Sequence, residues 1–480
     1  MSRTTYCVAL DFGATSGRVI LGQWTRHRLT LHEVHRFPNA FRTLGRHDYW
    51  ELGTLWHEAV VGLRKAAAAL PRGAVLHSVG VDCWGVDYVL VNDAGRLVFP
   101  VHAYRDARTQ AGLKRLANTR AALARIYAAT GIPNVFYNSS LQLAEAVAAC
   151  PALEDLATRC LFLPDYFNYL LSGRMENEFT IASTSQLIDV HSRGWSRVAL
   201  DYFRLPPQWF SPPLLSGARL GRLRAEIAGE AAALARTQVI AVPGHDTACA
   251  YDAMPASPDG QDLFLSSGTW SLVGFESDQP VLGAEALAAR ISNERIGDGR
   301  YRPLTNVIGL WLIEGTLKDF ASRPATDRDW ARLIDAAEKL PPPAGLLDVT
   351  DPVFANPASM KAAIDGQLRR RRLRAPGNLA GYVRLICDSL GRGHADAMRA
   401  FERMTGRKFG RILIVGGGSK NRLLCQATAR EAGIPVVSFA LEGTAVGNLA
   451  SQLIALRAVQ DLPTFRRHLA ADLRQTVYAP

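Results

Sequence analysis

The chain has 480 residues, of which 48% are hydrophobic and 21% charged, with 40 glycines and 25 prolines. This composition is typical of globular proteins and excludes disordered, collagenous and fibrous classes. At about 150 residues per domain, the length predicts two large domains or three small ones. No apolar stretch approaches the ~18 residues of a membrane span, and Asp11 interrupts the N-terminal apolar run too early for a secretory signal, so we expect a cytoplasmic protein without membrane association.

The net charge of +11 favours anionic partners, among them nucleic acids, phosphorylated ligands and anionic membranes. The basic residues are dispersed and no nucleic-acid reader motif accompanies them, which argues against nucleic acid. The arginine run at 369–372 is interpreted as a solvated face. Seven cysteines lack metal-type spacing and are interpreted as reduced thiols.

The N-terminal half begins with a predicted β-hairpin. Residues 8–10 and 19–21 are β-rich and flank a turn bounded by Gly13 and Gly17. A second strand–turn–strand pattern covers residues 78–91. Helical sequence then dominates residues 113–150.

A helix that opens at Pro164 is expected to stop at Gly173. A strand at 238–242 runs into the turn Pro243-Gly-His-Asp-Thr247. A third hairpin at 262–275 has a glycine and hydroxyl turn like the first hairpin, half a chain earlier. We therefore predict an internal duplication with domains 1–248 and 249–480.

The second half continues with a helix over 379–404 and a fully apolar strand at 411–415. Because strands alternate with helices along the chain, the predicted class is α/β.

Three glycine-rich turns, at 13–18, 266–269 and 416–419, are candidate phosphate cradles, since glycine lets backbone N–H groups close on phosphate oxygens. Each alone is also ordinary hairpin chemistry. Together, in a duplicated chain, they favour nucleotide binding. No Walker A loop occurs, and Asn421 stands where a dinucleotide fingerprint needs its third glycine.

Asp246 is the candidate general base, because it follows a strand end at the predicted domain junction. The alternative is that Asp246 caps a helix beginning at Thr247. Asp11 could hold a hydrated Mg²⁺ or initiate a turn, and His245 could orient a substrate.

The other candidate side chains have structural interpretations. Turn and capping roles are expected for Asp82, Asp87 and Asp165. Trp84, Trp270 and Trp311 are expected in the core rather than against a sugar or an adenine.

Eight motifs in the sequence resemble those of the FGGY carbohydrate kinases of the actin-like ATPase fold, and within them the rhamnulokinases. The resemblance covers nearly the whole chain. Its motifs are Val8-Ala-Leu-Asp-Phe-Gly-Ala-Thr-Ser-Gly-Arg18, Val79-Gly-Val-Asp-Cys-Trp-Gly-Val-Asp87, Tyr104-Arg-Asp-Ala-Arg108, Leu163-Pro-Asp-Tyr-Phe167, Gly244-His-Asp-Thr247, Leu265-Ser-Ser-Gly-Thr-Trp-Ser-Leu272, Asn306-Val-Ile-Gly-Leu-Trp311 and Val415-Gly-Gly-Gly-Ser-Lys-Asn421.

The resemblance implies two RNase H-like domains around a central cleft, with sugar binding in the N-terminal domain and nucleotide binding in the C-terminal domain. It implies that Asp246 accepts the proton of a sugar hydroxyl. The residues implied to hold the ketose, besides Asp246, are Gly85, His245, Thr247 and Asn306. The residues implied to contact ATP are Ala14, Thr15, Ser16, Gly17, Arg18, Thr269, Glu314, Gly416 and Gly417.

The implied reaction is ATP-dependent, Mg²⁺-dependent phosphorylation of L-rhamnulose at its 1-hydroxyl, in L-rhamnose catabolism. Glu314 stands where the rhamnulokinase pattern has glutamine, and residues 292–297 lack an Asn-Glu-Gly-Gly run. L-fuculose or another ketose therefore stays open as the substrate. Two alternatives of other classes are a partner-regulated actin-like ATPase and a basic nucleic-acid-binding protein.

Overall fold

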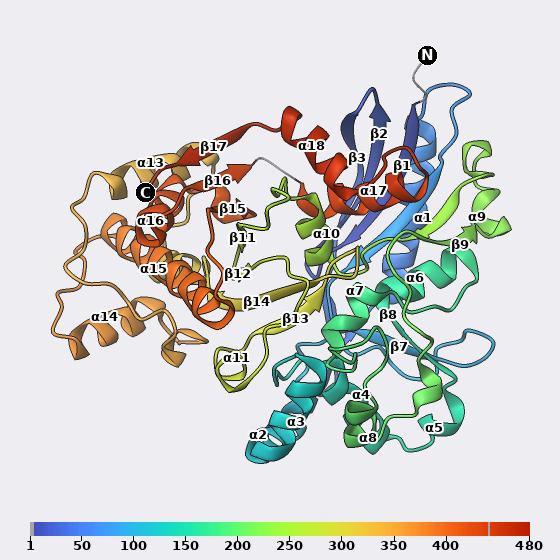
Figure 1. The fold of residues 1–480 in the computed structure, drawn as a ribbon, viewed down its shortest axis with the longest axis horizontal. Coiled ribbons are helices and arrows are strands. Elements are labelled where there is room, and N and C mark those ends of the chain that lie inside the picture. Colours follow the sequence, from blue (N-terminus) through green and yellow to red (C-terminus); the bar gives the residue numbers. More distant parts are fainter. Residues whose placement is uncertain (1–3, 440–441) are drawn as a thin grey trace. The chain divides into compact units, whose positions relative to one another are not determined.

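The computed structural model describes residues 4–439 and 442–480, which form two compact units (Figure 1). Each unit combines segments that are distant in the sequence. The first unit consists of Met1–Pro255, Ser277–Pro303 and Glu442–Asp472. The second unit consists of Ala256–Glu276, Leu304–Leu441 and Leu473–Pro480.

The first unit is built on a six-stranded sheet of order β3-β2-β1-β6-β10-β9. β2 is antiparallel to both of its neighbours, β1 and β3. The strands β1, β6 and β10 run parallel to one another, and β9 is antiparallel to β10. The strands are β1 (Thr5–Phe12), β2 (Ser16–Thr25), β3 (Arg28–Pro38), β6 (Ser78–Cys83), β9 (Ala218–Arg222) and β10 (Gln238–Ala241).

The second sheet has seven strands in the order β13-β14-β12-β11-β15-β16-β17. Its strands are β11 (Asp262–Ser267), β12 (Trp270–Gly274), β13 (Ser292–Arg295), β14 (Tyr301–Ile308), β15 (Arg411–Val415), β16 (Val436–Phe439) and β17 (Gln475–Tyr478). Three antiparallel strands, β14-β12-β11, are followed by the parallel β15 and β16, which repeats the arrangement of β3-β2-β1-β6-β10. This repetition agrees with the predicted duplication and the RNase H-like fold.

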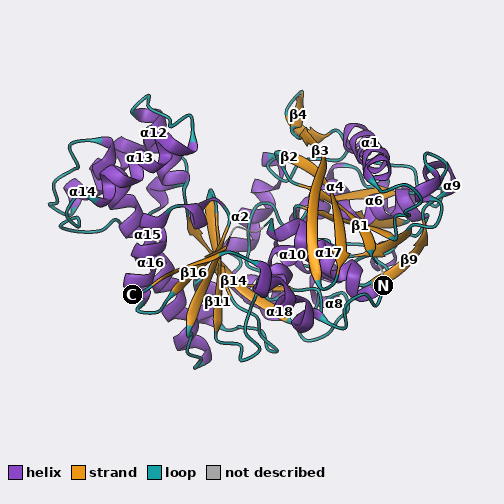
Figure 2. Ribbon diagram, turned by 90° about the horizontal axis from the view of Figure 1, so that it is seen from above, coloured by secondary structure: helices purple, strands orange, loops and turns teal. Residues whose placement is uncertain are grey.

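Helices cover both faces of the first sheet (Figure 2). Val19 and Gly22 lie three residues apart on β2 and so on opposite faces. A methyl group on Gly62 of α1 would lie 2.2 Å from Val19, and one on Gly22 would lie 2.6 Å from Leu449 of α17. Helices of the first unit are α1 (Leu52–Ala69), α2 (Gln110–Asn118), α3 (Arg120–Thr130), α4 (Ser139–Ala149), α5 (Leu153–Leu156), α6 (Leu163–Ser172), α7 (Phe179–Ala182), α8 (Arg197–Phe203), α9 (Ala225–Ala228), α10 (Asp246–Ala253), α11 (Ala284–Ala288), α17 (Gly443–Ala455) and α18 (Leu462–Asp472).

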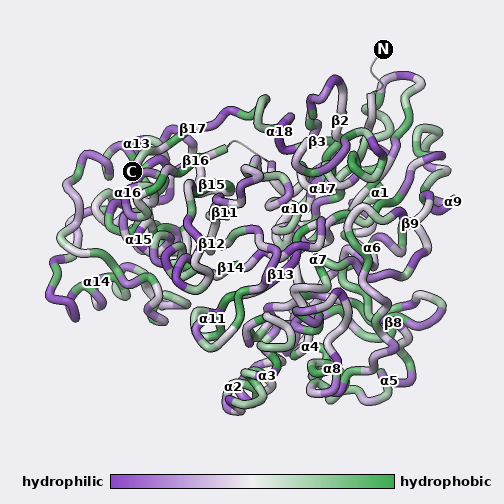
Figure 3. Tube along the Cα trace, viewed as in Figure 1, coloured by the Kyte–Doolittle hydropathy of each residue, from purple (hydrophilic) through white to green (hydrophobic). Residues whose placement is uncertain are grey.

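The second unit has its own apolar core, which is formed largely by side chains of its helices. Leu312, Ile364 and Ile386 belong to this core. The helices are α12 (Trp311–Asp319), α13 (Asp327–Glu338), α14 (Met360–Arg370), α15 (Leu379–Thr405) and α16 (Arg422–Ala432). The arginines at the end of α14 are exposed, as predicted, and contribute to the hydrophilic colour there in Figure 3.

Most predicted elements are confirmed, including the hairpins β1–β2 and β11–β12. α6 ends at Gly173, which adopts the left-handed conformation that favours glycine. One pattern was interpreted incorrectly: β6 does not pair with β7 (Tyr88–Val91), which instead pairs with β8 (Arg159–Phe162) in a separate small sheet. A second two-stranded sheet contains β4 (Phe41–Leu44) and β5 (His47–Trp50).

Trp270 contradicts its predicted core position, because it is 48% exposed on the hairpin turn, whereas Trp84 is buried. Within residues 4–439 and 442–480, no helix is long and apolar enough to cross a membrane.

Candidate active site

Asp246 is the first residue of α10, directly after the loop that follows β10. Its side chain is 31% exposed, and its Oδ1 accepts hydrogen bonds from the Thr247 amide (2.5 Å) and from Thr247 Oγ1 (3.0 Å). The helix begins at Asp246, one residue before the predicted start, and His245 occupies the N-cap position without a side-chain cap. Asp246 Oδ1 still accepts from an amide of the first turn, and the exposed part of its side chain leaves it reachable by a ligand.

The loop that carries Asp246 is fixed by Glu178, a buried residue that the sequence did not single out. Glu178 Oε2 accepts from the amide of Gly244 at 2.9 Å and from the amides of Thr180 and Ile181 at the start of α7. Burial raises the pKa of Glu178, while these donors favour its ionised form. One carboxylate thus joins α7 to the loop before His245.

Asp11 and Asp82 form a carboxylate cluster on neighbouring strands of the first unit, and the charge of Asp246 acts on both. β1 and β6 run parallel with Asp11 directly opposite Asp82, so both carboxylates lie at the same end of the sheet. Burial raises the pKa of both groups, and the charge of Asp246 raises each further. The turn role expected for Asp82 is wrong, since Asp82 lies inside β6 and is fully buried.

This cluster fits a hydrated divalent cation. Asp82 Oδ2 accepts from Asn448 Nδ2 at 2.7 Å, whereas Asp82 Oδ1 is buried with no hydrogen-bond partner among the described atoms. In the part of the chain that the structure describes, no three His, Cys, Asp or Glu side chains are placed as a direct metal cage. Mg²⁺ usually keeps several waters and takes few protein ligands, so Asp11 and Asp82 suit it better than a dedicated cage would.

The predicted phosphate turn at 13–18 connects β1 to β2. Asn39 Nδ2 donates to the carbonyl of Gly13 at 2.9 Å, and the Asn39 amide donates to the carbonyl of Thr15 at 3.0 Å. Among the described residues, the amides of Ala14 and Thr15 have no hydrogen-bond acceptor. The turn is therefore held from its carbonyl side, with amide donors available to an anion.

The last residues of this turn have structural partners. Arg18 forms ion pairs with Asp11 and with Glu442, which directly precedes α17. Gly17 packs against Phe37, so closely that a methyl group would lie 2.1 Å from its ring. Ser16 starts β2.

Gly85 and Val86 form a strained turn after β6. Val86 has φ +70°, a backbone conformation that branched residues rarely adopt. The turn is held by Thr184 Oγ1, which accepts from the Val86 amide at 3.2 Å, and by Ser139 Oγ, which donates to the Val86 carbonyl at 2.6 Å. Strain that is fixed in this way is typical of functional sites.

Gly85 brings this turn close to His245. A methyl group on Gly85 would lie 3.2 Å from His245 Nε2 and 3.4 Å from Thr184 Cγ2. Two residues later, Asp87 Oδ2 accepts from Trp50 Nε1 at 2.6 Å and Trp84 Nε1 at 2.8 Å, which is a buried network rather than the expected turn or capping role.

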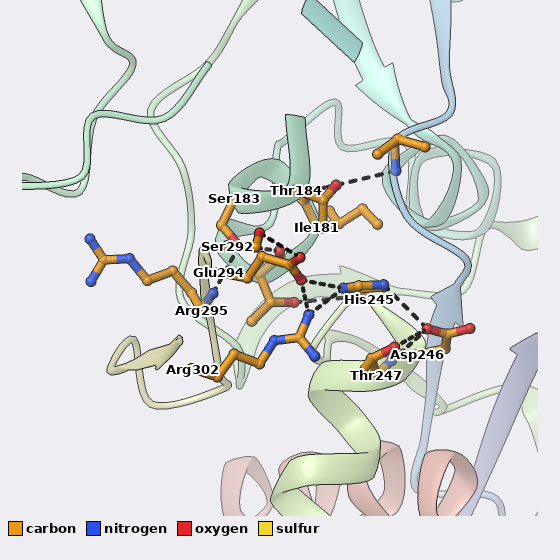
Figure 4. Close-up of polar contacts among 12 residues, drawn as sticks. Ile181, Ser183, Thr184, His245, Asp246, Thr247, Ser292, Glu294, Arg295 and Arg302 are labelled. Carbon is orange, nitrogen blue, oxygen red and sulfur yellow. Dashed lines mark hydrogen bonds and ion pairs between the residues drawn. The ribbon is translucent and has the colours of Figure 1, made fainter. Parts of the chain in front are cut away.

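His245 also contacts two residues that the sequence analysis missed, the partly buried Glu294 and the buried Arg302 (Figure 4). Arg302 is fully buried and forms an ion pair with Glu294. Burial alone would raise the pKa of Glu294, but the charge of Arg302 lowers it to about 2. The sequence could not predict that these residues contact His245, since about fifty positions separate them from it and the contact forms only in the folded chain.

The predicted nucleotide residues of the second unit meet around the β11–β12 turn. Thr269 is exposed there, and its carbonyl accepts from the amides of Gly309 (3.1 Å) and Trp311 (3.2 Å). Gly416 has φ +84°, and a methyl group on it would lie 2.6 Å from the carbonyl oxygen of Ser267. The structure therefore places the turns at 266–269 and 416–419 side by side.

The remaining predicted residues lie in the same unit. Glu314 is in the first turn of α12 and forms an ion pair with Arg323 at 3.3 Å. Gly417 lies near Leu310, which directly precedes α12. Asn306 is exposed on β14, where it pairs with Leu272 of β12.

One known protein family matches both halves of the chain. The FGGY family of carbohydrate kinases matches with its N-terminal domain at residues 6–251 and its C-terminal domain at residues 263–456. The chain belongs to the FGGY family of carbohydrate kinases. FGGY kinases transfer phosphate from ATP to a sugar hydroxyl, so this chain is a sugar kinase that uses ATP.

Two curated relatives in this family are rhamnulokinases. Those of Klebsiella pneumoniae and of an Enterobacter species are each 37% identical to the chain, over 99% of it and 94% of their own length. Among solved structures, gluconate kinase from Lactobacillus acidophilus has a TM-score of 0.81 at 14% identity, covering 100% of this chain and 94% of its own. A xylulose kinase from the same organism has a TM-score of 0.79 at 14% identity, covering 99% and 94%. These structures share the two-domain actin-like ATPase fold.

Proposed function

We propose that this sugar kinase phosphorylates L-rhamnulose at its 1-hydroxyl, giving L-rhamnulose 1-phosphate and ADP as a step of L-rhamnose catabolism. The observation that carries the proposal is the 37% identity to rhamnulokinases over 99% of the chain. The proposal is also supported by the position of Asp246 after β10 and of Gly85 after β6, where a methyl group on Gly85 would lie 3.2 Å from His245 Nε2.

Asp246 would act as the general base of the reaction. In this step the sugar O–H bond breaks and its proton passes to Asp246, while the hydroxyl oxygen forms a bond to the γ-phosphorus. The bond from the γ-phosphorus to the bridging oxygen breaks, and its electron pair leaves with ADP. Oδ1 of Asp246 is already engaged by Thr247, and in the described part of the chain Oδ2 has no partner, so Oδ2 is the accepting oxygen.

The other roles follow the motifs. Besides Asp246, we assign ketose binding to Gly85, His245, Thr247 and Asn306. We assign ATP binding to Ala14, Thr15, Ser16, Gly17, Arg18, Thr269, Glu314, Gly416 and Gly417. Four of the five assigned ketose-binding residues lie in residues 1–248, whereas the assigned ATP contacts are divided between residues 14–18 and residues 249–480.

Asp11, with Asp82 next to it, would hold Mg²⁺ through water. Bound Mg²⁺ neutralises charge on the phosphates of ATP. The strands β1 and β6 fix the positions of the two carboxylates. Asn448 donates to Oδ2 of Asp82, and Oδ1 has no hydrogen-bond partner among the described atoms.

The test is ADP release with Mg²⁺ and ATP across L-rhamnulose, L-fuculose, L-ribulose, L-xylulose, D-xylulose and glycerol. Strong stimulation by L-rhamnulose alone is expected. Stimulation by a different sugar alone would contradict rhamnulose specificity and identify that sugar as the substrate. A steady ADP release that no sugar changes would overturn the proposal in favour of an ATPase without a sugar substrate.

A further inference from the structure

His245 lies between a buried arginine and the proposed base. Its Nδ1 is 2.5 Å from Arg302 Nη2, and its Nε2 is 3.3 Å from Asp246 Oδ1 (Figure 4). Glu294 Oε2 is 3.3 Å from the same Nδ1 and forms an ion pair with Arg302. The ring therefore connects a buried ion pair to the reacting carboxylate.

The short contact with Arg302 determines where the imidazole carries its proton. A guanidinium group has only donors and stays protonated in proteins. Two N–H donors cannot face each other at 2.5 Å, so Nδ1 must be the acceptor from Arg302. A neutral imidazole then carries its proton on Nε2, which lies 3.3 Å from Asp246 Oδ1.

We propose that Arg302 is a positioning residue that fixes the Nε2–H tautomer of His245, so that His245 donates to Asp246 Oδ1. This inference rests on the proposed role of Asp246. Two Thr247 donors already engage Oδ1, and donation from His245 would hold the carboxylate in that orientation, with Oδ2 left without a partner among the described residues.

Glu294 compensates the charge of the buried Arg302. Arg302 is 0% exposed, and its Nε and Nη1 have no hydrogen-bond partner among the described atoms. A buried charge without a counter-charge is strongly destabilising, so the Glu294 carboxylate is required to keep Arg302 in place. Ser292 Oγ donates to Glu294 Oε1 at 3.0 Å and orients that carboxylate in turn.

The other tautomer would use Glu294 differently. A proton on Nδ1 could be donated to Glu294 Oε2, but it would then point toward Arg302 as well. The lone pair of Nε2 would face the Asp246 carboxylate, which repels it. Removing Arg302 while keeping Glu294 removes the donor that occupies Nδ1, so Nδ1 can then carry a proton toward Glu294 Oε2.

The tautomer can be measured by long-range proton–nitrogen NMR correlation on protein labelled with ¹⁵N-histidine. The signal of His245 is identified by its loss in His245→Gln. We expect a proton on Nε2 alone in the wild type and in Arg302→Lys, which keeps a charged donor, and a protonated Nδ1 in Arg302→Met. Arg300→Met, a change two residues before Arg302 at a partly exposed side chain that pairs with Asp298, is the control and should leave the tautomer unchanged.

Turnover should follow the tautomer. We expect Arg302→Met to lower the kcat of ketose-dependent ADP release at least tenfold, with Arg302→Lys intermediate and Arg300→Met at the wild-type value. His245→Gln, whose amide reaches the Nε2 position and donates there, should retain at least tenfold more turnover than His245→Asn, whose amide reaches only the Nδ1 position.

Nδ1–H in the wild type would overturn the inference, and this result needs no variant to fold. Wild-type turnover and an unchanged tautomer in Arg302→Met would also overturn it. If no sugar stimulates the wild type, the proposed function fails, while the NMR result still decides the tautomer. If a sugar stimulates the wild type but His245→Gln and His245→Asn are equally active, donation from Nε2 is not used.

Discussion

At the residue scale, Asp246 has two oxygens with different surroundings, since Oδ1 accepts from Thr247 and Oδ2 does not. Asp246→Asn keeps the size of the side chain but removes its ability to accept a proton. We expect at least ~10²-fold lower kcat of ketose-dependent ADP release, with ATP affinity unchanged in calorimetry. Asp201→Asn, at an exposed residue of α8, is the control. Turnover near the wild-type value in Asp246→Asn would exclude Asp246 as the base.

Gly85 is expected to matter because of space rather than backbone conformation. In Gly85→Ala the new methyl group would lie 3.2 Å from His245 Nε2, which forces the ring or the strained turn to move. We expect at least a tenfold loss of kcat/KM for the ketose with little change in melting temperature. Gly53→Ala, at a helical position with no neighbour within 4 Å, should leave the kinetics unchanged. A Gly85→Ala enzyme with wild-type kcat/KM would show that this close approach is not needed.

Asp246 and His245 were predicted from a short turn next to a strand end, and Gly85 from the resemblance to the family's motifs; their roles stay predictions. Glu294 and Arg302 could not be predicted, because their relation to His245 exists only in the folded chain. Asp82 was predictable only in part. Aligning the ends of β1 and β6 places it opposite Asp11, but the turn-like residues after it suggested a turn or capping role.

At the scale of elements, the sequence predicted strands and helices better than their partners. The hairpins β1–β2 and β11–β12 are local, so their pairing follows from the turn between them. β6 and β7 are also adjacent, yet β6 pairs with β1 and β10, and β7 pairs with β8, because burial in a parallel sheet outweighs the local turn. The packing of α17 against β1 in the first unit had no sequence signal at all.

α17 supports the site through a close helix contact. Gly447 lies against α10, so that a methyl group on it would lie 1.8 Å from the carbonyl oxygen of Cys249. Gly447→Ala should therefore separate the two helices and lower the free energy of unfolding by about 2–3 kcal/mol. Because Asp246 begins α10, kcat should fall as well. Denaturant unfolding and ADP release measure both effects, and wild-type stability would mean that α17 can shift at no energetic cost.

At the scale of the whole molecule, buried carboxylates make stability depend on pH. Burial raises the pKa of Asp87 from 3.8 to about 6, although Trp84 and Trp50 donate hydrogen bonds to it. Burial also raises the pKa of Asp11, Asp82 and Asp165. The folded chain therefore binds more protons than the unfolded chain near pH 5, and stability falls as pH rises through this window.

Asp87→Asn removes one of these carboxylates and so tests how much Asp87 contributes to the pH dependence of stability. Between pH 4 and about pH 6.5 the difference in unfolding free energy between Asp87→Asn and the wild type should change by on the order of 3 kcal/mol, in favour of the variant at the higher pH. Glu294 has the opposite sign, since Arg302 lowers its pKa to about 2, and its contribution disappears only below pH 4.5. Denaturant unfolding at four or five pH values measures the difference. A difference that does not change with pH would show that Asp87 keeps an ordinary proton affinity in the folded protein, so that its hydrogen bonds offset its burial completely.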